Sequence, residues 1–199
     1  MARQDQDRRS AIIEAGYQLI AERGYSGATT AAICAAAGVS SGTFFHYFPT
    51  KASLLLGILE ADIDHEAARH VELLTLAEQD APQALDHWRA HLVNTAADPH
   101  LAGFVSALGD APDDPRVTAH LATESAGAHR LLVGLVDAGQ RQGAWRSDRP
   151  AERLAVWIGV LADGVLTRSV EDSSFGVHAH TDELDDVLKR IRLPPPDSG

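Results

Sequence analysis

The chain has 199 residues, and its 17 lysines and arginines against 28 aspartates and glutamates give a formal charge of −11. The single cysteine excludes a disulfide framework and a multi-cysteine zinc site, and there is no apolar run of about 18 residues that could span a membrane. The acidic balance, taken alone, argues against a nucleic-acid partner. Segment 1–10 is polar and lacks the apolar core of a secretory signal, so we expect a cytoplasmic protein without a membrane partner.

The composition predicts an all-helical chain, and the first two helices can be placed from their apolar residues and caps. Alanine is abundant and no segment alternates apolar and polar residues as a half-buried strand does, so we predict an all-α fold with about nine helices. The first helix is predicted over 8–23, where apolar residues recur every three or four positions and a glycine follows. The second is predicted over 30–37, where Thr29 or Thr30 can cap the first N–H groups and Gly38 ends the helix.

The spacing of the second and third helices is that of a helix-turn-helix, and a long fourth helix follows. Ser40 or Ser41 can cap a third helix, which ends by Phe48 because a proline follows. Thr50 can cap a long fourth helix over 51–78. A short glycine-containing turn separates the second helix from the third, and this is the spacing of a helix-turn-helix.

The rest of the chain is predicted to form helices joined by turns rich in proline and aspartate. Their predicted ranges are 82–97, 100–108, 115–142, 150–170 and 181–192, with a loop at 173–180 and a disordered tail at 194–199. Apolar residues of the helix over 115–142 are expected to face inward, namely Val117, Leu121, Leu131, Leu132, Leu135 and Val136. The helix over 150–170 has a wide apolar face made of Leu154, Trp157, Ile158, Leu161, Val165 and Leu166.

Segment 44–48 has aromatic side chains at four of its five positions. Phe44 and Phe48 are four residues apart, so they share one helix face and are expected to form part of a small core. Their expected neighbours are Ile12, Ile33 and Leu54. The polar and small residues of this short helix then lie on other faces, and a helix that begins with small residues can approach the major groove closely.

The span 8–55 resembles the DNA-binding domain of TetR-family transcriptional regulators. The matching residues stand in the family's order and spacing without gaps: Ala15, Thr29, Thr30, Ile33, Ala37, Gly38, Val39, Ser40, Gly42, Thr43, Phe48, Lys51 and Leu54. The resemblance covers about a quarter of the chain. It implies a three-helix helix-turn-helix DNA-binding domain over 1–50, and a helical ligand-binding and dimerisation domain over 51–193.

The resemblance also implies which residues contact DNA. Thr30 resembles the family's phosphate-contacting threonine, and Tyr47 stands at a position that often contacts phosphate. Lys51 begins the fourth helix, where its charge and the helix N–H groups can both meet a phosphate. Contacts to bases or nearby phosphates are expected from Ser41, Gly42, Thr43, Phe45 and His46.

The sequence departs from the family pattern in the residues available for DNA contacts. Phe45 stands where the family usually has tyrosine, so a phenolic hydrogen bond is lost while contact with a thymine methyl group or a sugar is kept. Ala31 and Ala32 replace polar or basic contact residues of some relatives. DNA affinity would then depend on the arginines within 3–9, unless these residues form a solvated, disordered start.

Function follows from the same resemblance. It implies a homodimeric repressor that binds a palindromic double-stranded operator and that a small-molecule inducer releases. The last two helices are expected to pair with their copies, because one wide apolar face otherwise has no partner. The expected inducer pocket uses aromatic and polar groups of the middle helices: Trp88, His91, Phe104, His129, Trp157 and Asp163. If Asp163 is buried in its apolar helix it needs a partner, and an interface or capping hydrogen bond is favoured over a ligand contact.

Other chemistry has less support. His87 and His91 have metal-ligand spacing on one helix face, and His65 and His70 form another pair, but no cysteine or carboxylate set completes a metal site. Cys34 is expected to be a packed side chain. No nucleophile elbow, phosphate loop or acid–base set predicts an enzyme or a cofactor. The main alternative is an all-α small-molecule-binding protein or enzyme without DNA-binding activity, and a second is a DNA-binding protein without a ligand.

The distribution of the charges along the chain shows that the acidic net charge does not argue against DNA as a partner. Residues 1–51 carry five basic and four acidic groups, whereas residues 52–199 carry twelve basic and twenty-four acidic groups. The whole acidic excess therefore lies outside the expected DNA-binding domain. We expect weak non-specific binding at physiological salt and a dependence on both half-sites of an operator.

Overall fold

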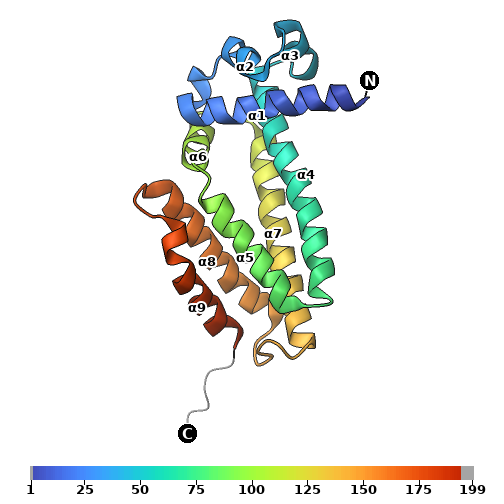
Figure 1. Ribbon diagram of the computed structural model, residues 1–199, viewed down its shortest axis with the longest axis vertical. Helices are drawn as coiled ribbons and strands as arrows, with labels where there is room; N and C mark the ends of the chain where they lie inside the picture. Colours follow the sequence, from blue (N-terminus) through green and yellow to red (C-terminus); the bar gives the residue numbers. More distant parts are fainter. Residues whose placement is uncertain (1, 194–199) are drawn as a thin grey trace. The chain divides into compact units, whose positions relative to one another are not determined.

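The computed structural model describes residues 2–193, with side chains from residue 5 onward, so the tail predicted at 194–199 lies outside the described residues. The described chain forms nine α-helices and one short 3-10 helix, and it contains no strand (Figure 1). The elements are α1 (Ala2–Gly27), α2 (Thr30–Ala37), α3 (Ser41–Tyr47), α4 (Lys51–Ala77), α5 (Ala81–Ala96), α6 (Leu101–Gly109), α7 (Pro115–Arg141), α8 (Ala151–Glu171), η1 (Val177–His180) and α9 (Thr181–Arg192). The predicted all-α fold is confirmed, and the largest difference is that α1 begins earlier than predicted.

The helices belong to two compact units. The first unit contains the described residues up to His65 together with Pro99–Leu121, and the second contains Glu66–Asp98 together with the described residues from Ala122 onward. The helices α4 and α7 each contribute residues to both units. These units are not divided at residue 50, and the functional division expected there stays a prediction.

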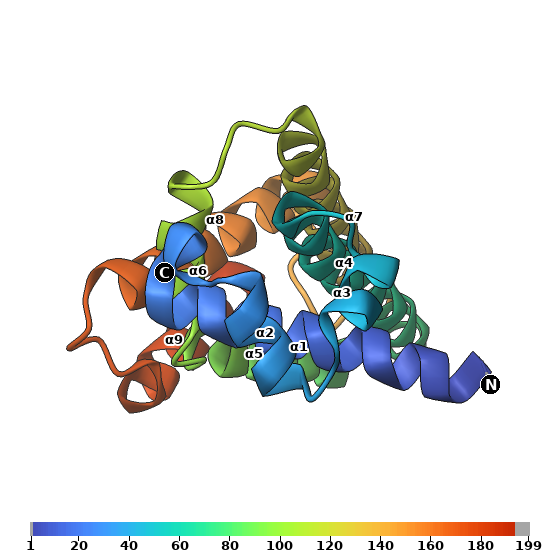
Figure 2. The same ribbon diagram turned by 90° about the horizontal axis from the view of Figure 1, so that it is seen from above.

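Local hydrogen bonds fix the ends of the short helices. Thr29 Oγ1 accepts the Ala32 N–H at 3.2 Å and caps α2, and Ser40 Oγ accepts the Thr43 N–H at 3.1 Å and caps α3. The helix α2 ends at Gly38, whose φ of 66° is left-handed and suits a residue without a Cβ atom. Figure 2 shows α2 beside α1, and α3 packs against α2.

The start of α4 is held by a reciprocal cap. Thr50 Oγ1 accepts the Ser53 N–H at 3.0 Å, and Ser53 Oγ accepts the Thr50 N–H at 3.0 Å. Two N–H groups that have no partner within the helix are satisfied in this way. The sequence therefore placed the boundaries of α2, α3 and α4 correctly, because each cap is made by residues within a few positions of the helix end.

The core of the first unit is built around the aromatic residues of α3. Phe44 is fully buried and Phe48 is almost so, and both lie in one apolar cluster with the fully buried side chains of Ile12, Ile33 and Leu54. The predicted packing of the two phenylalanines is confirmed. Cys34 is buried in the same cluster, as expected for a small packed side chain.

The core of the second unit is formed by α5, α8 and α9 with the adjoining parts of α4 and α7. Most residues predicted to face inward on α7 and α8 are buried or partly buried. Leu121 and Trp157 are exceptions, because their exposed fractions are 45% and 65%. Helical periodicity identifies an apolar face, but it does not determine which part of that face a neighbouring helix covers.

Candidate nucleic-acid interface

The short helix α3 gathers most of the residues expected to contact DNA. Ser41, Gly42, Phe45 and His46 are exposed, and Thr43 is partly buried. Phe45 has an exposed fraction of 51% and lies edge-on to the buried Phe44, with ring centroids 5.3 Å apart. The helix therefore buries one aromatic face in the core and presents small, hydroxylated and aromatic groups to solvent.

The Thr43 hydroxyl is already close to another hydroxyl. Its Oγ1 lies 2.9 Å from Ser40 Oγ, and either group can donate. Ser40 Oγ also accepts the Thr43 N–H, so the cap of α3 depends on the Ser40 side chain and not on the Thr43 side chain. Thr43 Oγ1 can therefore exchange its partner for a base or a phosphate without loss of the helix cap.

Tyr47, the last residue of α3, is tied to the beginning of α1. Its hydroxyl donates to the Asp5 carboxylate and lies 3.1 Å from the Asp5 backbone carbonyl oxygen. The hydrogen bond to Asp5 raises the pKa of Tyr47, with smaller contributions from burial and from the Asp5 charge, while the Arg8 charge acts in the opposite direction. The sequence did not indicate this contact, because the two residues are 42 positions apart.

Lys51 has partners within the protein that the sequence did not indicate. Its Nζ donates to the Tyr25 backbone oxygen at 2.5 Å and lies 3.5 Å from the Ser26 oxygen. The ammonium also lies 4.4 Å from the centroid of the Tyr25 ring. Lys51 thus binds carbonyl groups at the end of α1, where the helix leaves such groups without intrahelical partners.

The arginines near the start of α1 are only partly available for DNA. The Arg9 guanidinium lies 5.5 Å from the centroid of the Phe48 ring and 3.9 Å from the Glu60 carboxylate. Arg8 is exposed, whereas the Arg3 side chain lies outside the described residues. Thr30 is partly buried at the first position of α2.

The residues expected to bind the inducer have different surroundings in the structure, and their role in ligand binding stays a prediction. Trp88 is buried in the core of the second unit, whereas Phe104 belongs to the first unit and packs on Tyr17 with ring centroids 4.8 Å apart. His91 donates its Nε2–H to Glu66 at 3.1 Å. These contacts give each of the three side chains a packing or hydrogen-bonding partner within its own unit.

The remaining ligand candidates are on the surface. His129, Trp157 and Asp163 are exposed. Asp163 is exposed in the single chain, so the interface hydrogen bond expected for it stays a prediction. Asp163 follows apolar residues in the sequence of α8, but its position on the helix turns its side chain toward solvent.

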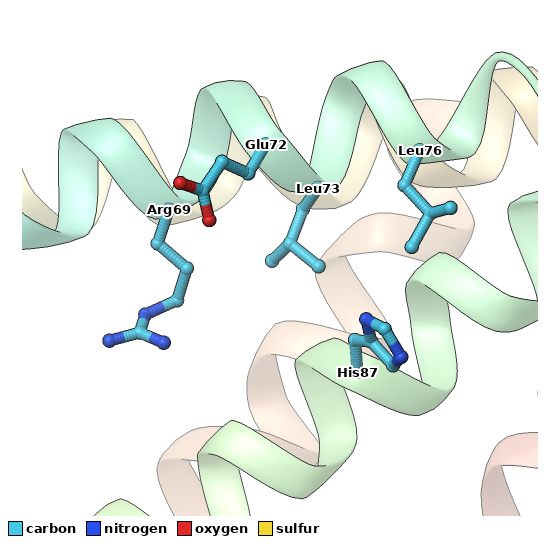
Figure 3. A pocket seen from close by; sticks show the side chains of 5 residues that line it. All are labelled: Arg69, Glu72, Leu73, Leu76 and His87. Carbon is cyan, nitrogen blue, oxygen red and sulfur yellow. The ribbon is translucent and has the colours of Figure 1, made fainter.

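A cavity of about 170 Å³ lies between α4 and α5 in the second unit and is lined by other residues (Figure 3). Leu73 and Leu76 point from α4 toward α5, and the charged side chains of Arg69 and Glu72 lie on the same helix. His87 approaches from α5. The spacing of His87 and His91 on α5 predicted a possible metal pair in this region, and none of the residues expected to bind the inducer lines this cavity.

A charged network lies beside this cavity. Glu66 accepts hydrogen bonds from His91 Nε2 at 3.1 Å and from Arg69 Nε at 3.2 Å. The hydrogen bond from His91 is the main cause of a lowered pKa of Glu66, against the opposing effect of burial. Burial lowers the pKa of His70, which lies 3.9 Å from the same carboxylate. Within the described residues no group of three or more histidine, cysteine or acidic side chains is arranged to hold a metal ion.

An apolar groove of about 460 Å³ runs along α8 and α9 in the second unit. Apart from Arg168, its lining is apolar: Trp157, Val160, Leu161, Gly164, Val165, Phe175, Val187 and Ile191. Trp157, Val160 and Val187 are exposed. Solvent-exposed apolar side chains gathered on one face mark a surface that another protein surface can cover.

Comparison with known proteins gives matches over the DNA-binding segment and over most of the chain. Residues 12–58 match the family model of bacterial regulatory proteins, tetR family. The transcriptional repressor AcnR of Corynebacterium efficiens is 26% identical over 186 residues, which cover 94% of this chain and 93% of AcnR. The transcriptional repressor KstR2 of Rhodococcus jostii is 26% identical over 161 residues, which cover 77% of this chain and 78% of KstR2.

A solved structure has the same fold. The TetR transcription regulator from Haloarcula marismortui matches with a TM-score of 0.76 at 20% sequence identity, over 95% of this chain and 100% of that chain. None of the helices in the described part of the chain is long and apolar enough to cross a membrane.

Proposed function

Because the chain is a TetR-family transcriptional regulator, we propose that it acts as a homodimeric repressor that a small molecule releases from a palindromic operator. The observation that carries this proposal is α3, a short helix that is anchored in the core by Phe44 and presents an exposed face beginning with Ser41 and Gly42. Such a helix can enter the major groove of double-stranded DNA. We further propose that the protein acts in the cytoplasm, with DNA as its main partner.

Two kinds of DNA contact are proposed. The side chains at the start of α3 and on its exposed face contact base edges or adjacent phosphates, namely Ser41, Gly42, Thr43, Phe45 and His46. Thr30, Tyr47 and Lys51 contact phosphates and fix the position of α3. Because few of these groups are charged, we expect modest affinity for one half-site and a strong gain when both half-sites are bound.

The apolar groove along α8 and α9 supports the homodimer. A two-fold axis brings the same surface of both copies together, and this would cover Trp157, Val160 and Val187 at once. Two copies related in this way present two recognition helices in opposite directions. The corresponding DNA site is an inverted repeat.

The second unit supports the binding of a small molecule. We propose the cavity between α4 and α5 as the candidate site, because it offers the Arg69 guanidinium, the His87 imidazole and the Glu72 carboxylate beside the apolar side chains of two leucines. A ligand there would affect DNA binding only if its affinity differs between the DNA-bound and free conformations. We expect no catalytic step in this response.

The experiment that tests the function is selection of bound sequences from random double-stranded DNA by the full-length chain. We expect an inverted repeat whose half-sites are separated by about one helical turn or a multiple of it. The affinity for that DNA should fall as salt rises, because phosphate contacts release counterions. Absence of enrichment together with absence of binding at low salt would overturn the proposal and favour the small-molecule-binding or enzymatic alternative.

A further inference from the structure

The hydroxyl of Tyr47 is occupied by an acidic residue from another helix. We propose that Asp5 competes with DNA phosphate for the Tyr47 hydroxyl and thereby weakens DNA binding until it is displaced. The inference rests on the proposed function, because it concerns a phosphate contact of the same interface. It assigns to Asp5 a role in setting DNA affinity.

The geometry of the contact joins two elements that are far apart in the sequence. Tyr47 closes α3 and Asp5 lies in the first turns of α1. The Tyr47 hydroxyl donates to the Asp5 carboxylate, and the Asp5 backbone carbonyl oxygen lies 3.1 Å from it. Tyr47 is partly buried while Asp5 is exposed, and the hydroxyl of the tyrosine contacts the exposed carboxylate.

The chemistry of the two acceptors makes them mutually exclusive. A tyrosine hydroxyl has one hydrogen to donate, and a carboxylate and a phosphate are both anionic acceptors. A phosphate oxygen can therefore take the Tyr47 hydrogen only after the Asp5 carboxylate has left. While Asp5 stays, its negative charge also opposes the approach of the phosphate.

The charges around the tyrosine fit this competition. Arg8 lies one turn after Asp5 on α1 and its charge acts on Tyr47 in the direction opposite to that of Asp5. If Asp5 moves away, the arginine remains as the charged neighbour of the hydroxyl. The site would then change from one filled by an internal anion to one that favours an external anion.

Asp7 provides a matched control within the same helix. It has the same charge and is exposed. Two residues along an α-helix correspond to a rotation of about 200°, so its side chain leaves the helix on nearly the opposite side from Asp5. Asp7 shares the general repulsion of DNA with Asp5, whereas the hydrogen-bond acceptors of the Tyr47 hydroxyl belong to Asp5.

The test compares Asp5→Ala with Asp7→Ala in the full-length chain. Both are made in the wild-type background and in a Tyr47→Phe background, and affinity is measured on a duplex of about 30 base pairs that carries the inverted repeat selected by the wild-type chain. We expect Asp5→Ala to tighten binding about tenfold, since a hydrogen bond to a charged group must otherwise be broken. Asp7→Ala should tighten binding only about twofold, as for an exposed charge.

The salt dependence and the Tyr47→Phe variant separate the effect of the Asp5–Tyr47 hydrogen bond from the general repulsion between acidic residues and DNA. Raising the salt from about 0.05 to 0.3 M should remove the Asp7→Ala gain by screening, whereas most of the Asp5→Ala gain should remain. In the Tyr47→Phe background, which lacks the hydroxyl, Asp5→Ala should tighten DNA binding no more than Asp7→Ala does. Circular dichroism and thermal unfolding of each variant would establish that α1 and α3 are still folded.

Three results would overturn the inference: equal gains from Asp5→Ala and Asp7→Ala, an undiminished Asp5→Ala gain in the Tyr47→Phe background, or weaker binding of folded Asp5→Ala. The last result would make Asp5 an anchor that DNA binding requires. All three leave the proposed function intact, because the wild type would still bind DNA in a salt-dependent manner. Failure of the wild-type chain to bind DNA at low salt would instead overturn the proposed function itself.

Discussion

The Lys51 ammonium donates to the Tyr25 backbone oxygen at 2.5 Å and lies 4.4 Å from the centroid of the Tyr25 ring. One side chain at the beginning of α4 thus stabilises the end of α1, because it satisfies a carbonyl group and interacts with an aromatic face. The same side chain was expected to bind a phosphate. Its internal contacts imply that Lys51 also keeps the first unit folded.

Substitution of Lys51 is therefore expected to affect both stability and DNA binding. We expect Lys51→Ala to lower the free energy of unfolding by about 1–2 kcal/mol, because a charge-assisted hydrogen bond and a cation–π contact are lost. Denaturant unfolding measures this change. Lys189→Ala, which alters the only other lysine and an exposed one, should change stability by less than about 0.5 kcal/mol. A Lys51→Ala protein as stable as the wild type would show that these contacts contribute little.

Two threonines are expected to separate binding from stability. Thr43→Val should weaken operator binding about tenfold because it removes a hydroxyl from the start of α3, and it should leave the melting temperature nearly unchanged because Ser40 makes the cap. Thr29→Val removes the cap of α2 and should cost about 1 kcal/mol of stability. Affinity on the selected operator and thermal unfolding provide the measurements. A large loss of stability in Thr43→Val would make Thr43 a structural residue.

A charge placed in the groove of α8 and α9 is expected to prevent dimerisation. Val160→Asp would bury a carboxylate at the centre of the proposed interface, where it has no partner. Sedimentation should then show a monomer in place of the dimer, with reduced affinity for the full inverted repeat. Val71→Asp alters another exposed valine on α4, outside the groove, and should stay dimeric. A dimeric Val160→Asp protein would exclude this groove as the interface.

The charged network in the second unit is expected to make stability depend on pH. The pKa of Glu66 is lowered in the folded protein, chiefly by the hydrogen bond from His91, so the ionised carboxylate contributes stability above its unfolded pKa. That contribution is lost as the pH falls through the lowered folded pKa. The difference in unfolding free energy between wild type and Glu66→Gln should therefore be full above about pH 5 and shrink below it.

A nearby acidic residue controls for this pH effect. Glu72 lies on the same helix and is exposed, so the difference between wild type and Glu72→Gln should vary little over the same range. Chemical unfolding at a series of pH values gives both curves. A Glu66→Gln difference that grows on acidification would contradict the direction of the pKa shift.

Local chemistry in the sequence determined the helices. Serine and threonine caps and left-handed glycines act within a few residues, so Ser40, Thr50 and Gly38 placed their helix ends correctly. The four-residue spacing of Phe44 and Phe48 likewise identified the buried face of α3, because helical geometry places both on one side. The family resemblance, carried by these same local elements, led to the DNA-binding function.

Tertiary structure alone decided the contacts between distant residues. Tyr47 meets Asp5 across 42 positions and Lys51 meets Tyr25 across 26, and no local pattern encodes either pair. Aromatic positions at similar spacings can face a core, a groove or solvent: Trp88 is buried in the core of the second unit, whereas Trp157 is exposed in the groove along α8 and α9. A sequence fixes which faces of its helices are apolar, but packing determines which of those faces are covered and which polar groups find partners.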